Sequence, residues 1–270
     1  MMKTRFLILA AAIGALMTGV VVSGCGSSSD SGSSNGDTLL VGSDIPYPPF
    51  EQGKAPNYDG FDIELVNEIA KRTGKTVKYQ DTAFDTIFRD VAQGKFDMVA
   101  SAATITPERE QTVDFSDPYY EANQAVVVAT GSDIKSVPDL DGKIIGAQDG
   151  TTGESYANDE ISADSVRGYG QGPEAIQAVK AGQVDAAIID EPVAQDALEN
   201  QSGIEIATVI STGELYGLAF AQDSDSLREE VNKALQEIKD DGTLQKLYEK
   251  WFPGVKVPDS VLNGTNESLK

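Results

Sequence analysis

The chain has 270 residues and a formal net charge of −22, from 21 basic and 43 acidic side chains. Its length suits one two-lobed protein or two small domains, and its charge disfavours nucleic-acid binding because the chain repels phosphates. The sequence has no histidine and one cysteine, which removes histidine-based catalysis, zinc or haem sites built on histidine or paired cysteines, and any disulfide within the chain.

The first residues have the pattern of an export signal. Lys3 and Arg5 precede the apolar run 6–22, which is the order of a secretory signal peptide. The run is near the shortest stretch that spans a bilayer, so an uncleaved membrane helix is the alternative. The next residues, Val22-Ser23-Gly24-Cys25, resemble the lipobox of bacterial lipoproteins, in which the chain is cut before a cysteine that becomes acylated.

The lipobox resemblance implies that residues 1–24 are a lipoprotein signal peptide and that Cys25 is the lipidation site. Residues 25–37 then form a linker, because GSSSDSGSSNG has too little apolar content to fold. We expect a soluble module that acyl chains hold on the extracytoplasmic side of a cell membrane, in the periplasm or on the outer surface.

From Thr38 onward, short apolar runs alternate with amphipathic stretches, a pattern typical of α/β proteins. Strands are predicted at 38–42, 77–80 and 96–100, and helices at 61–73 and 84–92. Thr106-Pro107 combines an N-cap threonine with a proline at the first helical position, which predicts another helix start.

A long apolar strand at 124–129 follows, and after it the alternation restarts. Further strands are predicted at 143–147, 184–189 and 216–221, and helices near 153–158, 173–181, 227–239 and 244–251. The strands 124–129 and 216–221 bracket a self-contained block, and the last helices need the first block as a packing partner. The sequence therefore predicts two lobes on a two-strand hinge that closes around a ligand, with these bounds: 38–125 and 220–258 for lobe 1, 126–219 for lobe 2, and a loose polar tail at 259–270.

Eight segments follow one another in a characteristic order: VGSDIPYPPF, GFDIELVNEIAKR, ASAATITPERE, VDFSDPYY, GKIIGAQDGTTGE, VDAAIIDEPVA, YGLAF and DGTLQKLYEKWF. Because of these segments, the chain resembles the polar amino-acid substrate-binding proteins of ABC importers (solute-binding family 3) over nearly all of residues 38–255. The resemblance implies the type 2 periplasmic-binding-protein fold, whose lobes close on an amino acid. It also implies a monomer with a permease partner, no catalysis and no cofactor.

A zwitterionic amino acid needs a cation for its carboxylate and an anion for its ammonium group. Arg109 follows a predicted helix start, where a guanidinium can hold a carboxylate with two hydrogen bonds. The alternative is a surface arginine paired with Glu108 or Glu110. Asp190 ends an apolar strand, at the edge where α/β folds bind ligands, and its alternative role is a cap on the helix that begins at Pro192.

The family resemblance assigns main-chain contacts to five positions. It implies that Arg109 and Thr152 bind the ligand carboxylate, and that Asp190 binds the ammonium group. It also implies that Ser101 and Thr104 contact the main chain of the ligand. For Thr152 the alternative is a simple helix cap within GTTG.

The side-chain pocket is assigned to Asp44, Tyr47 and Phe84. The two aromatics match the pair that encloses the ligand side chain in the family, although a core phenylalanine is the commoner use of this residue. Asp44 favours a cation, because a buried carboxylate without a partner is costly. Gln148 stands where family members carry lysine, and it does not repel a basic ligand. We therefore expect arginine, lysine or histidine first, and glutamine next.

These arguments give one set of candidate ligand-binding residues: Asp44, Tyr47, Phe84, Ser101, Ala102, Thr104, Arg109, Gln148, Thr152 and Asp190. The leading function is the substrate-binding component of an ABC importer for a polar L-amino acid. The alternatives are a prephenate or arogenate dehydratase on the same fold, with Glu191 or Asp44 as the acid, and the ligand-binding component of a sensor system. No metal site is expected, because only carboxylates are available and they lack the spacing of a calcium loop.

Overall fold

The structure is a computed structural model that describes residues 38–266, all within one compact unit. The predicted signal peptide, Cys25 and the linker lie outside the described residues. Between residues 38 and 266, no helix has both the length and the apolar character that a membrane span requires.

The first sheet has five strands in the order β4-β1-β5-β12-β6. Their bounds are β1 (Thr38–Ser43), β4 (Thr76–Asp81), β5 (Met98–Val99), β6 (Val113–Phe115) and β12 (Ala219–Ala221). β1 runs parallel to β4 and to β5, whereas β12 is antiparallel to β5 and β6. A strand from late in the chain thus lies inside a sheet that the early strands build.

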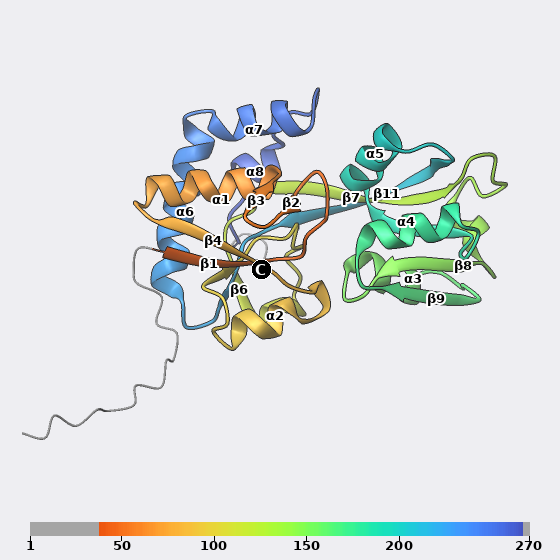
Figure 1. Cartoon of the computed structure of the whole chain (residues 1–270), viewed down its shortest axis with the longest axis horizontal. Coiled ribbons are helices and arrows are strands. Elements are labelled where there is room, and N and C mark those ends of the chain that lie inside the picture. The colour runs from red at the N-terminus through yellow and green to blue at the C-terminus, as the bar shows by residue number, and fades with distance from the viewer. Residues whose placement is uncertain (1–37, 267–270) are drawn as a thin grey trace, which may run out of the picture. The chain divides into compact units, whose positions relative to one another are not determined.

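Helices cover both faces of this sheet. Their bounds are α1 (Phe61–Arg72), α2 (Phe84–Ala92), α6 (Asp225–Asp240), α7 (Thr243–Trp251) and α8 (Asp259–Leu262). In Figure 1, α1 and α7 lie above the strands and α2 lies below them. α1 buries the face that its apolar spacing predicts, including Leu65 and Ile69. The late helices α6 and α7 both pack against α1, so the closing helices cover the first block as expected.

The second sheet has the order β11-β7-β10-β8-β9. Its strands are β7 (Tyr120–Ala129), β8 (Ile144–Gln148), β9 (Ser165–Tyr169), β10 (Ala186–Asp190) and β11 (Ile204–Tyr216), and its helices are α3 (Thr152–Asp159), α4 (Gly172–Lys180) and α5 (Glu191–Asn200). Along β10, Ile188 packs in the cluster with Ala157 of α3, and Ile189 packs in the cluster with Ile176 of α4. Successive residues of a strand face opposite sides, so helices on both faces explain why β10 is apolar throughout.

Two long strands connect the sheets. β7 and β11 pair antiparallel from Tyr120 opposite Tyr216 to Ala129 opposite Ile204, with two register shifts between those ends. Beyond them the pairing continues, because the Ser116 amide donates to the Leu218 carbonyl at 2.8 Å. The expected hinge of two strands is therefore present in the chain.

The prediction for the second hinge strand was wrong in its position. The sequence pattern placed one strand at 216–221, but β11 ends at Tyr216 and β12 begins at Ala219. Between them the Gly217 amide turns to the Ala103 carbonyl at 3.0 Å. β11 itself escaped prediction because IEIATVISTGELY does not alternate regularly, and Gly213 interrupts it at a φ of 60°.

Two smaller expectations were also wrong. The helix start at Thr106-Pro107 leads only to a single 3-10 turn, η1 (Arg109–Gln111), since β6 begins two residues later. The tail is not loose up to residue 266, because it forms α8 and the buried Asn266 donates to the Phe115 carbonyl at 3.2 Å. Further short elements that were not predicted include β2 (Gln52–Lys54), β3 (Asn57–Asp59) and η2 (Val137–Leu140), as well as β6 and β9.

Candidate functional site

All ten candidate residues line one cavity. Its lining is Asp44, Tyr47, Phe84, Ser101, Ala102, Thr104, Arg109, Gln148, Thr151, Thr152 and Asp190. The free space among these side chains is about 10 Å³, roughly the room of one water molecule. The lining side chains therefore fill the cavity themselves, and a ligand the size of an amino acid enters only when they move apart.

The first sheet and its loops position six of the lining residues. Asp44 and Tyr47 follow β1, Phe84 opens α2, and Ser101, Ala102 and Thr104 follow β5. Because β1 and β5 are parallel, their carboxyl ends lie at the same sheet edge. Ala102 adopts a φ of 45°, a left-handed conformation that alanine rarely takes, and its amide donates to the Asp62 carboxylate at 2.9 Å.

The second sheet positions the remaining lining residues apart from Arg109. Gln148 ends β8 and Asp190 ends β10, and these parallel strands also bring their carboxyl ends to one edge. Thr151 caps α3 by accepting from the Glu154 amide at 3.1 Å, so the simple cap expected within GTTG is Thr151. Thr152 directs its hydroxyl to the Glu214 carboxylate instead, at 2.6 Å.

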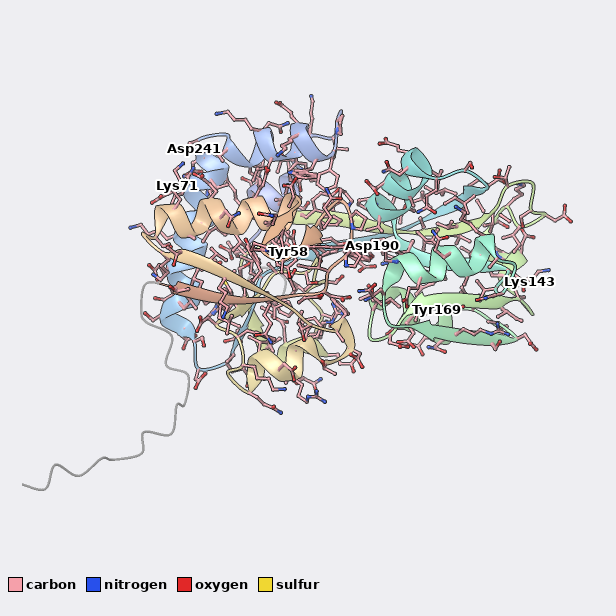
Figure 2. The ribbon with its side chains drawn as sticks, viewed as in Figure 1. Tyr58, Lys71, Lys143, Tyr169, Asp190 and Asp241 are labelled. Atoms are coloured by element: carbon pink, nitrogen blue, oxygen red, sulfur yellow. The ribbon has the colours of Figure 1, made fainter. Side chains whose placement is uncertain are left out.

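Figure 2 labels Asp190 between the part of the chain that holds the first sheet and the part that holds the second. Two side chains fix Asp190, rather than the helix that follows it. Its Oδ2 accepts from the Tyr47 hydroxyl at 2.7 Å, and its Oδ1 accepts from the Gln124 amide at 2.5 Å. Its side chain makes no cap hydrogen bond to α5. Burial, with a smaller contribution from Glu214, raises the pKa of Asp190 to about 6.

Arg109 reaches from the first lobe to the second. Nη1 donates to the Thr104 carbonyl at 2.8 Å, and Nη2 donates to the Gly150 carbonyl at 3.0 Å. The guanidinium carbon lies 4.5 Å from the ring centre of Phe88 and 5.3 Å from that of Phe84, which are cation–π distances. Burial lowers the pKa of Arg109 to about 10, so the side chain stays charged at neutral pH.

Asp44 is a buried carboxylate with an uncharged partner. Its side chain accepts a hydrogen bond from the Gln148 amide, which also donates to the Gly170 carbonyl at 3.2 Å. Burial and the nearby charges of Asp81 and Asp85 raise the pKa of Asp44 to about 7, against a lowering by the Gln148 hydrogen bond. A cationic group placed beside Asp44 would favour its ionised form.

The two aromatic candidates both belong to core clusters. Tyr47 and Phe84 are each 7% exposed, and both line the cavity. Phe84 also packs edge-to-face on Phe88 at 5.6 Å between ring centres and belongs to a core cluster. The core use of Phe84 and its place in the cavity wall are therefore compatible.

Comparison with known proteins decides the family. Residues 39–254 match the family model of the bacterial extracellular solute-binding proteins, family 3. The chain belongs to this family. Its α/β fold with two lobes and a two-strand hinge, the type 2 periplasmic-binding-protein fold, is confirmed.

Relatives of this family-3 protein are similar over most of its length. The arginine-binding extracellular protein ArtP of Bacillus subtilis (strain 168) is 35% identical over 262 residues, which are 95% of this chain and 100% of that protein. An ancestral arginine-binding protein bound to arginine is 42% identical, with a TM-score of 0.75 over 80% of this chain and 98% of that chain. An ancestral arginine-binding protein bound to glutamine is 41% identical, with the same TM-score and the same coverage.

The sequence of this solute-binding protein did not reveal two polar residues beside the cavity. Glu214 on β11 accepts from the hydroxyls of Thr104 and Thr152 through Oε2, at 2.7 and 2.6 Å. The amide of the buried Gln124 donates to Glu214 Oε1 at 2.9 Å as well as to Asp190. The signal for Gln124 was a polar residue opening an apolar run, whereas Glu214 lay on a strand that the pattern did not predict.

Two further acids of the solute-binding protein lie behind the cavity wall. Glu51 and Asp62 are both 0% exposed. Glu51 accepts from the Ser101 hydroxyl at 2.9 Å, and Asp62 accepts from the Ala102 amide and from the Tyr119 hydroxyl, at 2.9 and 2.8 Å. Burial, and for Glu51 also the Asp62 charge, raises the pKa of Glu51 well above its usual range and that of Asp62 to about 7. Across residues 38–266, no three His, Cys, Asp or Glu side chains are grouped to hold a metal ion.

Proposed function

We propose that this solute-binding protein is the extracytoplasmic substrate-binding component of an ABC importer for a polar L-amino acid. Basic amino acids are the preferred ligands, and glutamine comes next. The observation that carries the proposal is the meeting of Asp44, Arg109 and Asp190 in one cavity. Two acids and one base complement a molecule with two positive groups and one carboxylate, which is a basic amino acid.

The main chain of the ligand is matched by the polar groups that now bond to one another. Arg109, with Thr152, would take the ligand carboxylate in place of the backbone carbonyls that it now contacts. Asp190 would accept from the ammonium group, which offsets the cost of removing that group from water. Ser101 and Thr104 lie on the same wall and would contact the main chain.

The ligand side chain would lie between Tyr47 and Phe84 and end at Asp44. A guanidinium or ammonium group there would stabilise the ionised Asp44, and Gln148 could then turn its amide oxygen toward the same group. Glutamine would offer Asp44 only the hydrogen-bond donors of a neutral amide. The relative named for arginine binding and the neighbours bound to arginine and to glutamine support this order of ligands.

Closure of the lobes would couple binding to transport. Bonds such as Tyr47 to Asp190 and Arg109 to Gly150 join residues of different sheets, so a ligand between them contacts both lobes. Such a ligand stabilises the arrangement in which the lobes meet. We propose the lobe boundaries given by the sequence, 38–125 with 220–258 and 126–219, and a permease that recognises the monomer in this arrangement.

We also propose that acylated Cys25 anchors the protein on the extracytoplasmic side of the cell membrane, after removal of residues 1–24. The support is the Val22-Ser23-Gly24-Cys25 sequence and the extracellular family. Expression of a Cys25→Ser variant should move the protein from the membrane fraction to the soluble extracytoplasmic fraction. A Cys25→Ser protein that stays with the membrane would favour the uncleaved helix instead.

Thermal unfolding against all twenty L-amino acids tests the proposed ligand class. The purified protein is first unfolded and refolded to remove any ligand that co-purified. A ligand at about 1,000 times its Kd stabilises the fold by roughly 4 kcal/mol, so arginine, lysine or histidine should raise the melting temperature clearly. A shift with glutamine alone would reverse the ligand order, and no shift with any amino acid would reject the proposal.

The two alternative functions receive less support. The relatives and neighbours of this chain are named as binding proteins, which favours a binding role over a dehydratase. The cavity suits an importer component and a sensor component equally. The choice of an importer is supported by relatives such as the ABC transporter arginine-binding protein 1 of Escherichia coli (strain K12).

A further inference from the structure

Glu214 holds two hydroxyl groups that the proposed ligand would need. Its Oε2 accepts from Thr104 at 2.7 Å and from Thr152 at 2.6 Å. A hydroxyl group has one hydrogen to donate, so both hydrogens point to the same carboxylate oxygen. While they do so, neither threonine can donate to the carboxylate of a ligand.

The position of Glu214 is fixed from several sides. The segment of Thr104 runs beside the end of β11, since the Ile105 amide donates to the Leu215 carbonyl at 2.8 Å. The Gln124 amide holds the other carboxylate oxygen of Glu214 at 2.9 Å. Among the charged neighbours of Arg109, Glu214 acts most strongly to raise the pKa of the guanidinium, against the lowering by burial. Glu214 thus lies among the groups that would bind a ligand carboxylate.

We propose that Glu214 is an affinity- and specificity-determining residue, whose carboxylate occupies the place of the ligand carboxylate and must be displaced when an amino acid binds. This inference rests on the proposed function. Glu214 also lines a wide groove with Ser155 and Thr212, whose side chains are exposed or partly exposed. The displaced carboxylate can therefore turn to water without becoming a buried, unpaired charge.

The charge of Glu214 also bears on which ligands bind. After displacement it remains near the ligand carboxylate, and like charges at such a separation repel each other. A ligand with an additional positive group is attracted by the same charge, so the net penalty is smaller for arginine than for an uncharged analogue. Together with Asp44 and Asp190, Glu214 would thus bias the site toward basic amino acids.

The test measures L-arginine and L-citrulline binding to the purified full-length protein by calorimetry. Citrulline has nearly the shape of arginine but an uncharged side chain. Glu214→Gln preserves the size of the side chain and removes its charge. Arginine should bind about three- to tenfold tighter to this variant, and citrulline should gain more than arginine. Glu205→Gln is the matched control, because Glu205 lies on the same strand and pairs with Lys135 at 2.8 Å, outside the cavity.

The outcomes distinguish a failure of this inference from a failure of the proposed function. Unchanged or weaker arginine binding to Glu214→Gln would overturn the inference, as would an equal change in Glu205→Gln. If the wild-type protein binds no amino acid, the proposed function itself fails.

A second variant keeps the inference testable if Glu214→Gln folds poorly. Thr152→Val removes a hydroxyl that the ligand and Glu214 share. In a chain that keeps Glu214, Thr152→Val should weaken arginine binding only slightly, because the Thr152 hydroxyl must leave Glu214 before it can donate to the ligand. In a Glu214→Ala background the same change should cost several-fold more affinity. Equal costs in both backgrounds would show that the two carboxylates do not compete.

Discussion

The Tyr47 hydroxyl donates a hydrogen bond of 2.7 Å to Asp190 Oδ2, and the two residues are 143 positions apart in the chain. One follows β1 in the first sheet, and the other ends β10 in the second. The bond therefore joins the two lobes at the carboxylate that we assign to the ligand ammonium group. Binding an amino acid would exchange this contact for one with the ligand.

Arginine affinity should rise with pH between 5 and 8. The pKa of Asp190 is raised to about 6 and that of Asp44 to about 7, so both carboxyls are mainly protonated at pH 5. The positive groups of arginine bind the ionised forms, and binding at low pH must therefore release protons, at a cost of up to tenfold in affinity per group and pH unit.

Calorimetry at pH 5, 6.5 and 8, in two buffers of different ionisation enthalpy, measures both the affinity and the released protons. Asp44→Asn should remove the part of the dependence near pH 7 and weaken arginine more than glutamine. Equal affinity at pH 5 and pH 8 would contradict the assignment of both acids.

Arg109→Ala should weaken amino-acid binding strongly while the fold persists. The guanidinium contacts two backbone carbonyls and lies over the Phe88 ring, and we assign it to the ligand carboxylate. Losing a partly buried charged partner costs about 2–5 kcal/mol of binding free energy. Titration calorimetry gives the loss, and thermal unfolding monitors the fold. Arg89→Ala, which removes an exposed arginine paired with Asp90, should bind normally. Arginine binding by Arg109→Ala that is as tight as that of the wild type would reject the assignment.

Gly172→Ala should oppose closure of the lobes. A methyl group at Gly172 would lie 2.6 Å from Tyr47 Cε2 and 2.9 Å from Ile189 Cδ1. Tyr47 belongs to the other lobe, so opening relieves the clash with its ring, whereas the buried Ile189 lies in the same lobe as Gly172 and must shift in the open and closed arrangements alike. Strain of this kind costs about 1–3 kcal/mol. We expect weaker arginine binding from the clash with Tyr47 and a lower melting temperature of the ligand-free protein from the clash with Ile189.

The control for this change lies two residues away. At Gly170 the nearest atom to an added methyl group is Glu174 Oε2 at 3.8 Å, an ordinary contact. Gly170→Ala should bind arginine as the wild type does. If both alanine variants bind normally, Tyr47 and Gly172 do not meet when the ligand is bound.

Glu51→Gln should stabilise the protein at alkaline pH. Native Asp62 keeps its proton up to a pKa of about 7, against an ordinary value of 3.8, and Glu51 is shifted in the same direction. Between pH 4 and 7 the unfolded chain has lost protons that the native state retains. The free energy of unfolding therefore falls as pH rises through this window, by up to about 1.4 kcal/mol per pH unit and group.

Replacing Glu51 by glutamine removes one of the two buried acids and should flatten this fall. Urea unfolding at pH 4.5 and pH 8 measures the free energy of unfolding. At pH 8 this free energy should be higher for the variant than for the wild type, and at pH 4.5 the difference should disappear. A wild-type stability that does not fall between these values would show that the pair carries no proton in the native state.

The regular elements were predictable where one period dominated the sequence. The helix predicted at 84–92 has those bounds in α2, and the one predicted at 61–73 differs from α1 by one residue. Both have an apolar stripe that only a helix can bury against the sheet. In the second sheet, β8, β10 and the second half of β7 are apolar on both faces, and their runs were equally visible. β9 and β11 were missed because neither shows a regular alternation of apolar and polar residues.

The candidate site was predictable where residues end a strand or match a family segment. Asp190 follows a buried strand, and such positions meet at one sheet edge. Glu214 could not be found in this way, since its place in the cavity depends on the register of β11 against β7 and on the segment around Thr104. The local sequence pattern does not predict which distant segments pair with one another. The hydrogen bonds between the lobes join distant segments, so they could not be predicted either.

The side chains that line the cavity hydrogen-bond to one another, and these bonds affect how the protein distinguishes its ligands. When the lobes meet without an amino acid, Tyr47, Gln148 and the two threonines already satisfy the carboxylates. An incoming molecule shifts the balance of open and closed forms only by the interactions it adds beyond these. A molecule with one polar group too few would leave that balance where it was. The protein would thus close on a complete amino acid, whereas fragments of an amino acid would not drive closure.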